Sequence, residues 1–358
     1  MRRIKLDLGA RSYEIVIDRG LRTRLGGEIA KVWTPRQVLL LTDDHVGPLH
    51  LQQASASLTA AGFAVTEMVV PHGEGSKSLS ELERVYNVMA DAHMTRSAGV
   101  VALGGGVCGD LAGFAAATYM RGVAFIQVPT SLTAQVDSSV GGKTAINLGP
   151  AKNTVGSFYQ PDLVLVDPDY LDTLSDRYLT EGYAEVLKMA TLTDPARCWQ
   201  LLADVNSAAD IRRVSPELID FAIHYKASVV AADERDLGLR QLLNFGHTLG
   251  HAIELLAHGD LAHGEAVSVG MVQLTRITEA RGLTTPGTAD QIAERLRAVG
   301  LPIDSPLLHD ADLLPQILMD KKMRSNQLNL VVLKQIGDPE ILPVKRPDVA
   351  EFLNLQEA

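Results

Sequence analysis

The stretch that decides the fold is residues 99–110, which read Gly-Val-Val-Ala-Leu-Gly-Gly-Gly-Val-Cys-Gly-Asp. An apolar strand runs into a turn with glycines at 104, 106 and 109, and a helical pattern follows near 108–118. Glycines at this spacing let the backbone approach a pyrophosphate at a helix N-terminus. The turn therefore predicts a dinucleotide site, with a plain tight turn as the alternative that these residues alone leave open.

The residue expected to hold the ribose is absent from its usual place. An acidic side chain is normally found about 20 residues after such a turn, but that region reads Tyr119-Met120-Arg121-Gly122. Asp43, at the end of an earlier apolar run, is the candidate for this role.

Short apolar runs alternate with helical patterns on both sides of the glycine turn. The predicted strands lie at 38–42, 64–70, 99–103, 125–128 and 163–166, with helical segments near 49–61, 79–93 and 108–118. Alternation of this kind is typical of a parallel sheet covered by helices on both faces. From about Ser175 the strands give way to helical spacing near 178–193, 216–232, 243–257, 264–281 and 288–299.

These patterns predict two domains. We expect an α/β N-terminal domain with a Rossmann-like parallel sheet at 1–175, and an all-α, or mainly helical, C-terminal domain at 176–358. The first would bind NAD, the second would bind metal and substrate, and the active site would lie in the cleft between them. A length of 358 residues agrees with two domains, because a single core rarely grows beyond about 300 residues.

Composition excludes several classes of protein. The formal net charge is −10 with no run of basic residues, which argues against nucleic-acid binding because that needs Lys and Arg over phosphates. No apolar run reaches the ~18 residues of a membrane-spanning helix, and no apolar signal segment follows Met1. Only Cys108 and Cys198 are present, too few for a disulfide framework. We therefore expect a cytoplasmic protein.

A second anion-binding signal lies at Gly141-Gly142-Lys143-Thr144, followed by Lys152. It resembles the end of a phosphate-binding loop, but that loop needs glycine at position 137, where Asp137 stands. A nucleoside triphosphatase is therefore disfavoured. The segment predicts a turn that presents two lysines, with solvated surface charge as the alternative.

Three histidines suggest a metal site. His247 and His251 are four residues apart and share one face of a predicted helix, and His263 follows in His263-Gly264-Glu265. Thr248 stands where a zinc protease would carry its catalytic Glu, so that class is disfavoured. Glu185 is available as a carboxylate ligand, but the residues themselves do not decide between the histidines, or between ligands and core histidines.

Four long stretches together resemble the 3-dehydroquinate synthase family: 104–110, 127–132, 135–144 and 243–254, within a resemblance that runs from about 38 to 335. Two positions depart from the expected pattern, Cys108 for an aliphatic residue and Ser131 for Thr, and both are small changes.

The resemblance implies a role for each residue of the site. Metal ligands would be Glu185, His247 and His263, which assigns His251 to the substrate. Contacts with NAD would come from Asp43, Gly73, Glu74, Gly75, Ser76, Lys77, Gly105, Gly106, Val107, Cys108, Gly109, Asp110, Thr130, Ser131, Lys143, Lys152, Tyr170, Leu171, Asp172 and Thr173. Contacts with substrate would come from Asp137, Lys143, Asn153, Lys188, Lys226, Arg240, Asn244, His251 and one of Lys321 or Lys322. A homodimer is implied, with Arg121 similar to the residue that one subunit lends to its partner.

The family's reaction converts 3-deoxy-D-arabino-heptulosonate 7-phosphate to 3-dehydroquinate in the shikimate pathway. It would proceed by transient oxidation with NAD, β-elimination of phosphate, reduction, ring opening and intramolecular aldol closure, helped by a zinc or cobalt ion. The alternatives are a cyclase acting on another sugar phosphate, a metal-dependent alcohol dehydrogenase that releases NADH, and a non-catalytic relative. Lys226, Arg240 and Asn244 favour a substrate with a carboxylate, which the other cyclases' sugars lack.

Overall fold

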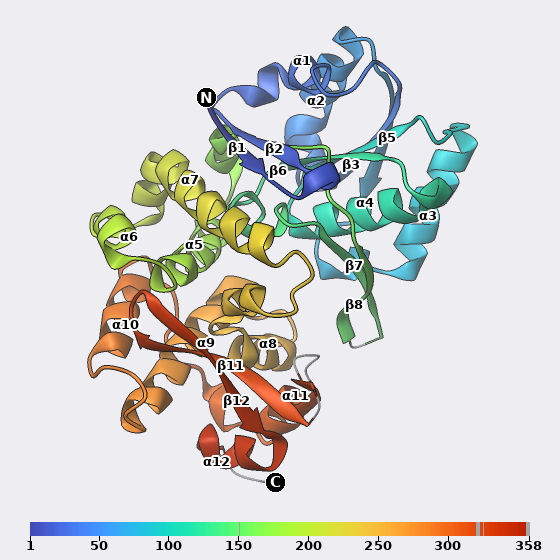
Figure 1. Ribbon diagram of the computed structural model, residues 1–358. Helices are drawn as coiled ribbons and strands as arrows, with labels where there is room; N and C mark the ends of the chain where they lie inside the picture. Colours follow the sequence, from blue (N-terminus) through green and yellow to red (C-terminus); the bar gives the residue numbers. More distant parts are fainter. Residues whose placement is uncertain (150, 320–322, 325, 356–358) are drawn as a thin grey trace. The chain divides into compact units, whose positions relative to one another are not determined.

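A computed structural model describes residues 1–149, 151–319, 323–324 and 326–355 (Figure 1). Contacts divide the chain into two compact units. The first comprises Met1–Leu174 and Lys226–Arg235, and the second comprises Ser175–Tyr225 and Asp236–Ala358. The first unit thus ends at Leu174, next to the expected boundary at 175. Residues 226–235 belong to the first unit again.

The first unit is built on a sheet of seven strands. In spatial order they are β1 (Arg2–Leu6), β2 (Tyr13–Ile17), β9 (Leu163–Val166), β6 (Ala124–Pro129), β5 (Gly99–Gly104), β3 (Gln37–Asp43) and β4 (Ala64–Val70). All neighbours run parallel except the edge pair β1 and β2. The five strands expected from the apolar runs are all present, and β1 and β2 extend the sheet beyond them.

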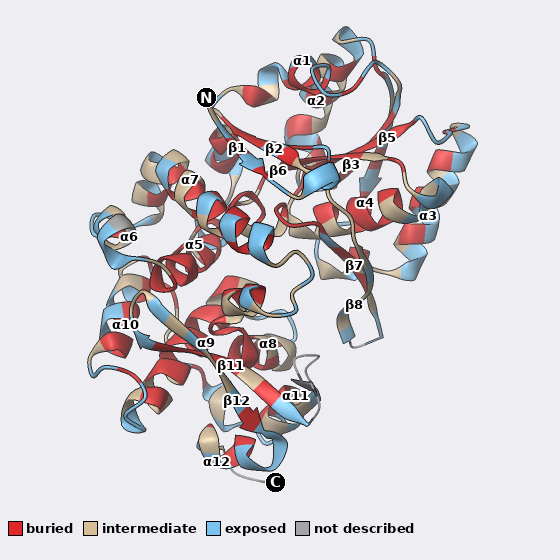
Figure 2. Cartoon of the chain, viewed as in Figure 1, coloured by how far each residue is buried: buried red, intermediate tan, exposed pale blue. Residues whose placement is uncertain are grey.

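Helices cover both faces of this sheet, because side chains of its strands point alternately to one face and to the other. Leu39 and Leu41 of β3 pack in one core with α3 (Leu79–Asp91) and α4 (Gly106–Thr118). Val38 and Leu40 pack in a second core with α1 (Leu25–Ile29) and α2 (Gly47–Ala60). Side chains along a strand alternate between faces, so a continuous apolar run serves two cores at once. Figure 2 shows the central strands as mostly buried, and β5 is buried along its whole length.

The order of the parallel strands creates a switch point between β3 and β5. From β3 the chain moves outward to β4, and then crosses back to β5, β6 and β9 on the other side. In sheets of this kind, ligands bind at the carboxyl ends of the strands where the order reverses. Asp43 ends β3 and Gly104 ends β5, so both lie at this edge.

The segment with Lys143 and Lys152 is a hairpin, in which β7 (Lys143–Leu148) pairs with β8 (Ala151–Phe158). The sequence predicted a turn here, and the turn is shorter than expected because strand pairing takes up most of the segment. Lys143 begins β7 and Lys152 is the second residue of β8.

The second unit is mainly helical. Its longer helices are α5 (Asp176–Thr191), α6 (Pro195–Leu202), α7 (Ala208–Ala232, whose end belongs to the first unit), α8 (His247–Leu256), α9 (His263–Ala280), α10 (Thr288–Ala298) and α11 (Leu313–Met319). The helical segments expected from the apolar spacing correspond to α5, α7, α8, α9 and α10. Among the described residues, no helix is both long and apolar enough to cross a membrane.

A small antiparallel sheet completes the second unit, so the expectation of an all-α domain needs correction. Strands β10 (Met323–Arg324), β11 (Gln327–Gln335) and β12 (Asp338–Lys345) form it. Leu328, Leu330 and Val332 point from β11 into a core with Leu249 and Ile253 of α8. The alternating pattern of β11 carries a strand signal that the helical reading of this half overlooked.

Candidate metal and nucleotide sites

Glu185, His247 and His263 converge in the second unit. Oε1 of Glu185 lies 3.5 Å from Nε2 of His247 and 3.4 Å from Nε2 of His263. Glu185 is fully buried in α5, while the two histidines are the first residues of α8 and α9. Three residues that lie far apart in the sequence thus direct one oxygen and two nitrogens toward a common point.

Close packing of three helices produces this convergence. A Cβ on Gly264 would lie 1.9 Å from the carbonyl oxygen of Glu181, so α9 begins directly against α5. A Cβ on Gly270 would lie 2.0 Å from the carbonyl oxygen of Gly246, so α9 also contacts the start of α8. Only glycine permits backbones this close. Gly264 therefore brings His263 to the helix that carries Glu185.

Both imidazoles are oriented by hydrogen bonds on their far sides. Nδ1 of His247 donates to the carbonyl oxygen of Phe245 at 3.0 Å, and Nδ1 of His263 donates to Oε2 of Glu254 at 2.9 Å. Donation from Nδ1 leaves the lone pair on Nε2, the nitrogen that faces Glu185. Histidines that bind metals are held by carboxylates or carbonyls in this manner.

The surroundings of Glu185 fit a bound cation. Oε2 accepts a hydrogen bond from Lys188, but Oε1 is buried and accepts none from the described part of the chain. Ligands of a tetrahedral ion with bonds near 2.05 Å are about 3.3 Å apart, close to both spacings at Oε1. A buried carboxylate oxygen needs a partner, and a divalent ion supplies one.

His251 offers an alternative ligand. Nitrogens of His247, His251 and His263 all lie within 4.8 Å of one another. We prefer Glu185, His247 and His263 as the ligands. This set explains the buried Oε1 of Glu185, and its atoms lie closer together. Burial favours the neutral form of His263, but Glu185 and Glu254 outweigh this and raise its pKa well above the usual value. A metal cation at Nε2 would take the place of the proton that these carboxylates favour there, because a histidine ligand must be neutral.

Three of the predicted nucleotide residues, Glu74, Lys77 and Asp110, share a hydrogen-bonded group with Asn147 and Asn153. Lys77 Nζ donates to Oδ2 of Asp110 at 2.6 Å and also to the side-chain oxygen of Asn153. Glu74 accepts from Nδ2 of Asn147 at 2.8 Å. Burial raises the pKa of Asp110, and the ammonium of Lys77 opposes this shift. The turn η3 (Glu74–Ser76), α4 and the β7–β8 hairpin are thereby joined beside the switch point.

The glycine turn is tightly enclosed. A Cβ on Gly109 would lie 2.6 Å from the side chain of Gln127, which explains the close approach of α4 to β6. A Cβ on Gly106 would lie 2.9 Å from Oγ of Ser138, in the π-helical turn η5 (Ala134–Ser138). Gly105 begins α4 as its N-cap without a side chain that covers the amides. The turn therefore fits the close backbone approach that a pyrophosphate needs.

Asp43 lies across the switch point from this turn. Its Oδ1 accepts hydrogen bonds from the backbone amides of His45 and Val46 at 2.9 and 2.8 Å. A Cβ on Gly104 would lie 3.4 Å from its Oδ2. One oxygen thus holds the loop, and the other faces the glycine turn.

The remaining predicted nucleotide residues also belong to the first unit. Tyr170 and Leu171 are buried in η6 (Pro168–Thr173), and Oγ1 of Thr173 lies 3.0 Å from Nε2 of His50. The thiol of Cys108 is buried and donates to the carbonyl oxygen of Leu41 at 3.4 Å, so only its backbone is available to a ligand. The others are Gly73, Gly75, Ser76, Val107, Thr130, Ser131, Lys143, Lys152 and Asp172.

The predicted substrate residues fall in both units. Lys226 and Asp137 are paired in the first unit, where Lys143, Asn153 and Arg121 also lie. The second unit holds Lys188, Arg240, Asn244 and His251, with Arg240 only 2% exposed. Lys321 and Lys322 lie outside the described residues.

Sequence reasoning missed the residues that support these sites. Glu254 was noted only as the end of a family stretch, and Gln127, Asn147 and Glu181 had no assigned role. The backbone carbonyl of Phe245 has no sequence signal at all. Of these residues, Glu254 was the easiest to predict from the sequence, because it follows His251 by three residues on the same helix.

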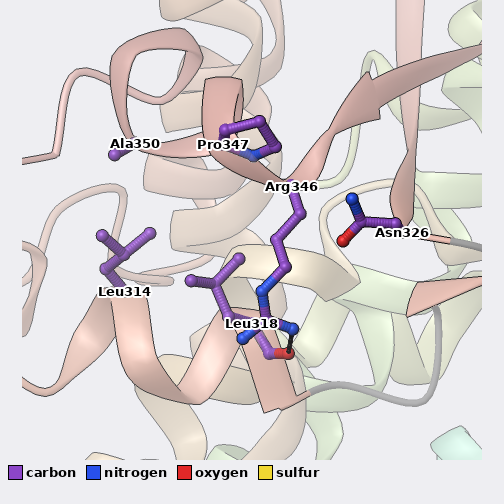
Figure 3. A pocket seen from close by; sticks show the side chains of 6 residues that line it. All are labelled: Leu314, Leu318, Asn326, Arg346, Pro347 and Ala350. Carbon is purple, nitrogen blue, oxygen red and sulfur yellow. Dashed lines mark hydrogen bonds between the residues drawn. The ribbon is translucent and has the colours of Figure 1, made fainter.

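The pocket in Figure 3 is separate from these residues. It has a volume of about 450 Å³ and is lined by Leu314, Leu318, Asn326, Arg346, Pro347 and Ala350. Arg346 extends across it and donates to the carbonyl oxygen of Leu318 at 3.4 Å. None of the predicted metal, nucleotide or substrate residues that the structure describes lines it.

Comparison with known proteins agrees with the sequence motifs. The model of the 3-dehydroquinate synthase N-terminal domain matches residues 67–181, and that of the C-terminal domain matches residues 182–323. The 3-dehydroquinate synthase of Leuconostoc mesenteroides is 52% identical over 353 residues, covering 99% of both chains.

Two solved structures share the architecture. A 2-deoxy-scyllo-inosose synthase complexed with carbaglucose-6-phosphate, NAD⁺ and Co²⁺ is 26% identical with a TM-score of 0.89, covering 98% of this chain and 99% of the other. The 2-epi-5-epi-valiolone synthase of Streptomyces hygroscopicus, with NAD⁺ and Zn²⁺ bound, is 27% identical with a TM-score of 0.85, covering 96% of each chain. The much higher identity to the curated relative, together with matches to both domain models, decides the assignment: this chain belongs to the 3-dehydroquinate synthase family.

Proposed function

We propose that this chain catalyses the reaction of its family, the conversion of 3-deoxy-D-arabino-heptulosonate 7-phosphate to 3-dehydroquinate and phosphate in the shikimate pathway. The full-length identity of 52% to a curated 3-dehydroquinate synthase supports this. The observation that carries the chemistry is the buried, unpaired oxygen of Glu185 that faces Nε2 of His247 and of His263.

Glu185, His247 and His263 are the proposed ligands of a divalent ion, zinc or cobalt, since both accept nitrogen and oxygen ligands. Such an ion lowers the pKa of a bound hydroxyl and polarises a carbonyl, while NAD accepts a hydride and returns it. Glu254 and the carbonyl of Phe245 hold the imidazoles in place for this task. Lys188 keeps the other oxygen of Glu185 occupied, so that a single oxygen remains for the ion.

NAD is proposed to bind at the switch point of the large sheet. Gly105 and Gly106 leave the first amides of α4 without a side-chain cap, available to the pyrophosphate, and Oδ2 of Asp43, which faces the glycine turn, is suited to a ribose hydroxyl. Lys77, held by Asp110 and Asn153, adds positive charge beside the phosphates. The other proposed contacts are Gly73, Glu74, Gly75, Ser76, Val107, Cys108, Gly109, Asp110, Thr130, Ser131, Lys143, Lys152, Tyr170, Leu171, Asp172 and Thr173.

Basic side chains are proposed to bind the phosphate and carboxylate of the substrate. Arg240 is almost fully buried, and a buried guanidinium favours a carboxylate or phosphate because it forms two parallel hydrogen bonds. Lys226 is held by Asp137. Lys143, Asn153, Asn244 and one of Lys321 or Lys322 complete the proposed set. His251 and Lys188 are assigned to proton transfer, with the substrate's own phosphate as a further base.

A homodimer is proposed, in which Arg121 reaches the partner's site. Arg121 is exposed and lies on a strained turn, with a φ of 66° and a φ of 50° at Met120. Strain of this kind is kept where the surrounding structure requires it, often at functional positions. A cytoplasmic location likewise stays a prediction.

The function is tested by incubating the protein with the heptulosonate phosphate, zinc or cobalt, and NAD⁺ at a small fraction of the substrate. We expect phosphate and 3-dehydroquinate in equal amounts, with no accumulation of NADH at 340 nm. Steady NADH production would point to an alcohol dehydrogenase. Turnover of glucose 6-phosphate, which lacks the carboxylate, in preference to the heptulosonate would point to another cyclase.

The ligand assignment is tested separately with His263→Ala. We expect this variant to lose tightly bound metal and turnover but to keep NAD affinity, because the proposed nucleotide residues lie in the first unit. Full turnover by a metal-free His263→Ala protein would refute the assignment.

A further inference from the structure

The start of α9 is held by three side chains of α5 that lie one helical turn apart. Arg177, Glu181 and Glu185 follow one another at intervals of four residues, so they share one face of α5. In reverse order, these side chains meet the first three residues of α9, 263–265. Glu185 is a proposed metal ligand, whereas Arg177 and Glu181 have no part in the function proposed above.

Glu181 supplies a cap that α9 lacks. The first amides of a helix have no acceptor within it, and the residue before the helix usually provides one from a side-chain oxygen. Ala262 stands at that position and has no such oxygen. Oε2 of Glu181 accepts instead from the amide of Gly264 at 3.0 Å, and the Glu181 side chain is only 7% exposed. The first turn of α9 is therefore tied directly to α5.

Arg177 fixes the same region from one turn away. Its guanidinium donates to both carboxylate oxygens of Glu265, at 2.8 and 2.7 Å, and to the carbonyl oxygen of Asp260 at 2.6 Å. Glu265 in turn accepts from the amide of Ala262 at 2.8 Å. A bidentate pair of this kind fixes orientation as well as distance. The loop before His263 and the first turn of α9 thus share an anchor on α5.

We propose that Glu181 and Arg177 are positioning residues of the metal site, which hold His263 against Glu185 before an ion binds. The inference rests on the ligand set proposed above. His263 directly precedes the amide that Glu181 holds, so a shift of that amide moves the imidazole. A site whose ligands are already in place binds more tightly, because little order has to be gained on binding. The face of α5 that supplies one ligand thereby sets the position of another.

The test is the zinc affinity of the full chain without NAD or substrate, measured by competition with a chelator. Glu181→Ala should bind zinc about 10-fold more weakly, as expected for a residue that orients a ligand. Glu181→Gln should bind nearly as wild type does, because its amide oxygen accepts the same hydrogen bond. Excess zinc should restore turnover to Glu181→Ala, and its NAD affinity should not change, because the proposed nucleotide residues lie in the first unit.

Ser305→Ala is the matched control. It also removes a buried capping oxygen of the second unit, one that accepts from the amide of Leu307 at 3.3 Å, and it should keep the wild-type zinc affinity. Wild-type affinity in Glu181→Ala would overturn the inference. Equal losses in Glu181→Ala and Ser305→Ala would also overturn it, since they would reflect a general loss of stability.

Two further variants keep the result unambiguous. If Glu181→Ala does not fold, Arg177→Gln replaces it, because Arg177 is 52% exposed, and unchanged zinc affinity in that variant would overturn the inference. His263→Ala tests the ligands themselves, and tight zinc binding by this variant would refute both the proposed ligand set and the inference that rests on it. Loss of zinc in His263→Ala beside wild-type affinity in Glu181→Ala would refute the positioning role alone.

Discussion

The carboxylate of Glu254 orients His263, one of the proposed metal ligands. It accepts the Nδ1 proton of His263 at 2.9 Å and thereby directs Nε2 toward Glu185. Partners of this kind are commonly worth about 10–100-fold in metal affinity. We therefore expect Glu254→Gln to weaken zinc binding by about that factor while the ligands themselves remain.

This prediction is checked by competition with a zinc chelator. Glu294→Gln, an exposed glutamate on α10, is the control and should bind zinc as wild type does. Excess zinc should restore turnover to Glu254→Gln, because the residue positions a ligand and is not one itself. Unchanged zinc affinity in Glu254→Gln would show that the hydrogen bond to His263 has no influence on the ion.

The contact between α5 and α9 depends on a glycine. A Cβ at 264 would lie 1.9 Å from the carbonyl oxygen of Glu181, and backbone atoms cannot yield as a flexible side chain can. Overpacking typically costs about 1–3 kcal/mol, and more where the backbone must move. We expect Gly264→Ala to lower the free energy of unfolding by about 3 kcal/mol or more, measured by urea denaturation.

The matched control is Gly27→Ala. Gly27 lies in α1, and a Cβ there meets no atom within 4 Å. Alanine in a helix is favoured over glycine by about 1 kcal/mol, so this variant should be as stable as wild type or slightly more stable. If Gly264→Ala matched Gly27→Ala in stability, α9 would not be packed against α5 as described.

The elements differ in how far the sequence predicts them. The five parallel strands beside the glycine turn are apparent from their apolar runs, because strands buried on both faces need no polar residues. The hairpin β7–β8 and strand β12 were missed, because their half-exposed segments give a weaker signal than a buried strand or a long helix. Strand β11 was missed although its largely buried apolar residues do carry a strand signal.

The candidate site was predictable only in part for a related reason. The spacing of His247 and His251 indicated a metal, and Glu185 was available as a carboxylate ligand, but only the family resemblance selected His263 and assigned His251 to the substrate. The close packing of α5, α8 and α9 could not be predicted from residue spacing. It depends on glycines that contact backbone atoms far away in the sequence.

The return of 226–235 to the first unit makes part of the molecule's stability dependent on pH. Arg11 binds Glu234 through two hydrogen bonds, at 3.1 and 2.5 Å. The guanidinium lowers the pKa of Glu234 from its usual 4.5. Folding therefore favours the ionised form, and this stabilisation is present above that usual value and lost as the pH falls through the lowered one.

We expect Arg11→Gln to reduce the loss of stability between roughly pH 5 and pH 3 relative to wild type. The measurement is the urea midpoint as a function of pH. Arg96→Gln, which changes an exposed arginine of the same unit, should keep the wild-type pH dependence. Identical slopes for Arg11→Gln and wild type would mean that the pair does not contribute to acid stability.

The account as a whole depends on one oxygen and two nitrogens binding the same ion. Anomalous diffraction from crystals of the zinc-loaded protein, recorded on both sides of the zinc absorption edge, locates that ion directly. We predict a peak about 2.0–2.2 Å from Oε1 of Glu185 and from Nε2 of His247 and of His263. A peak bound by His251 in place of Glu185, or no zinc at these three residues, would contradict the account.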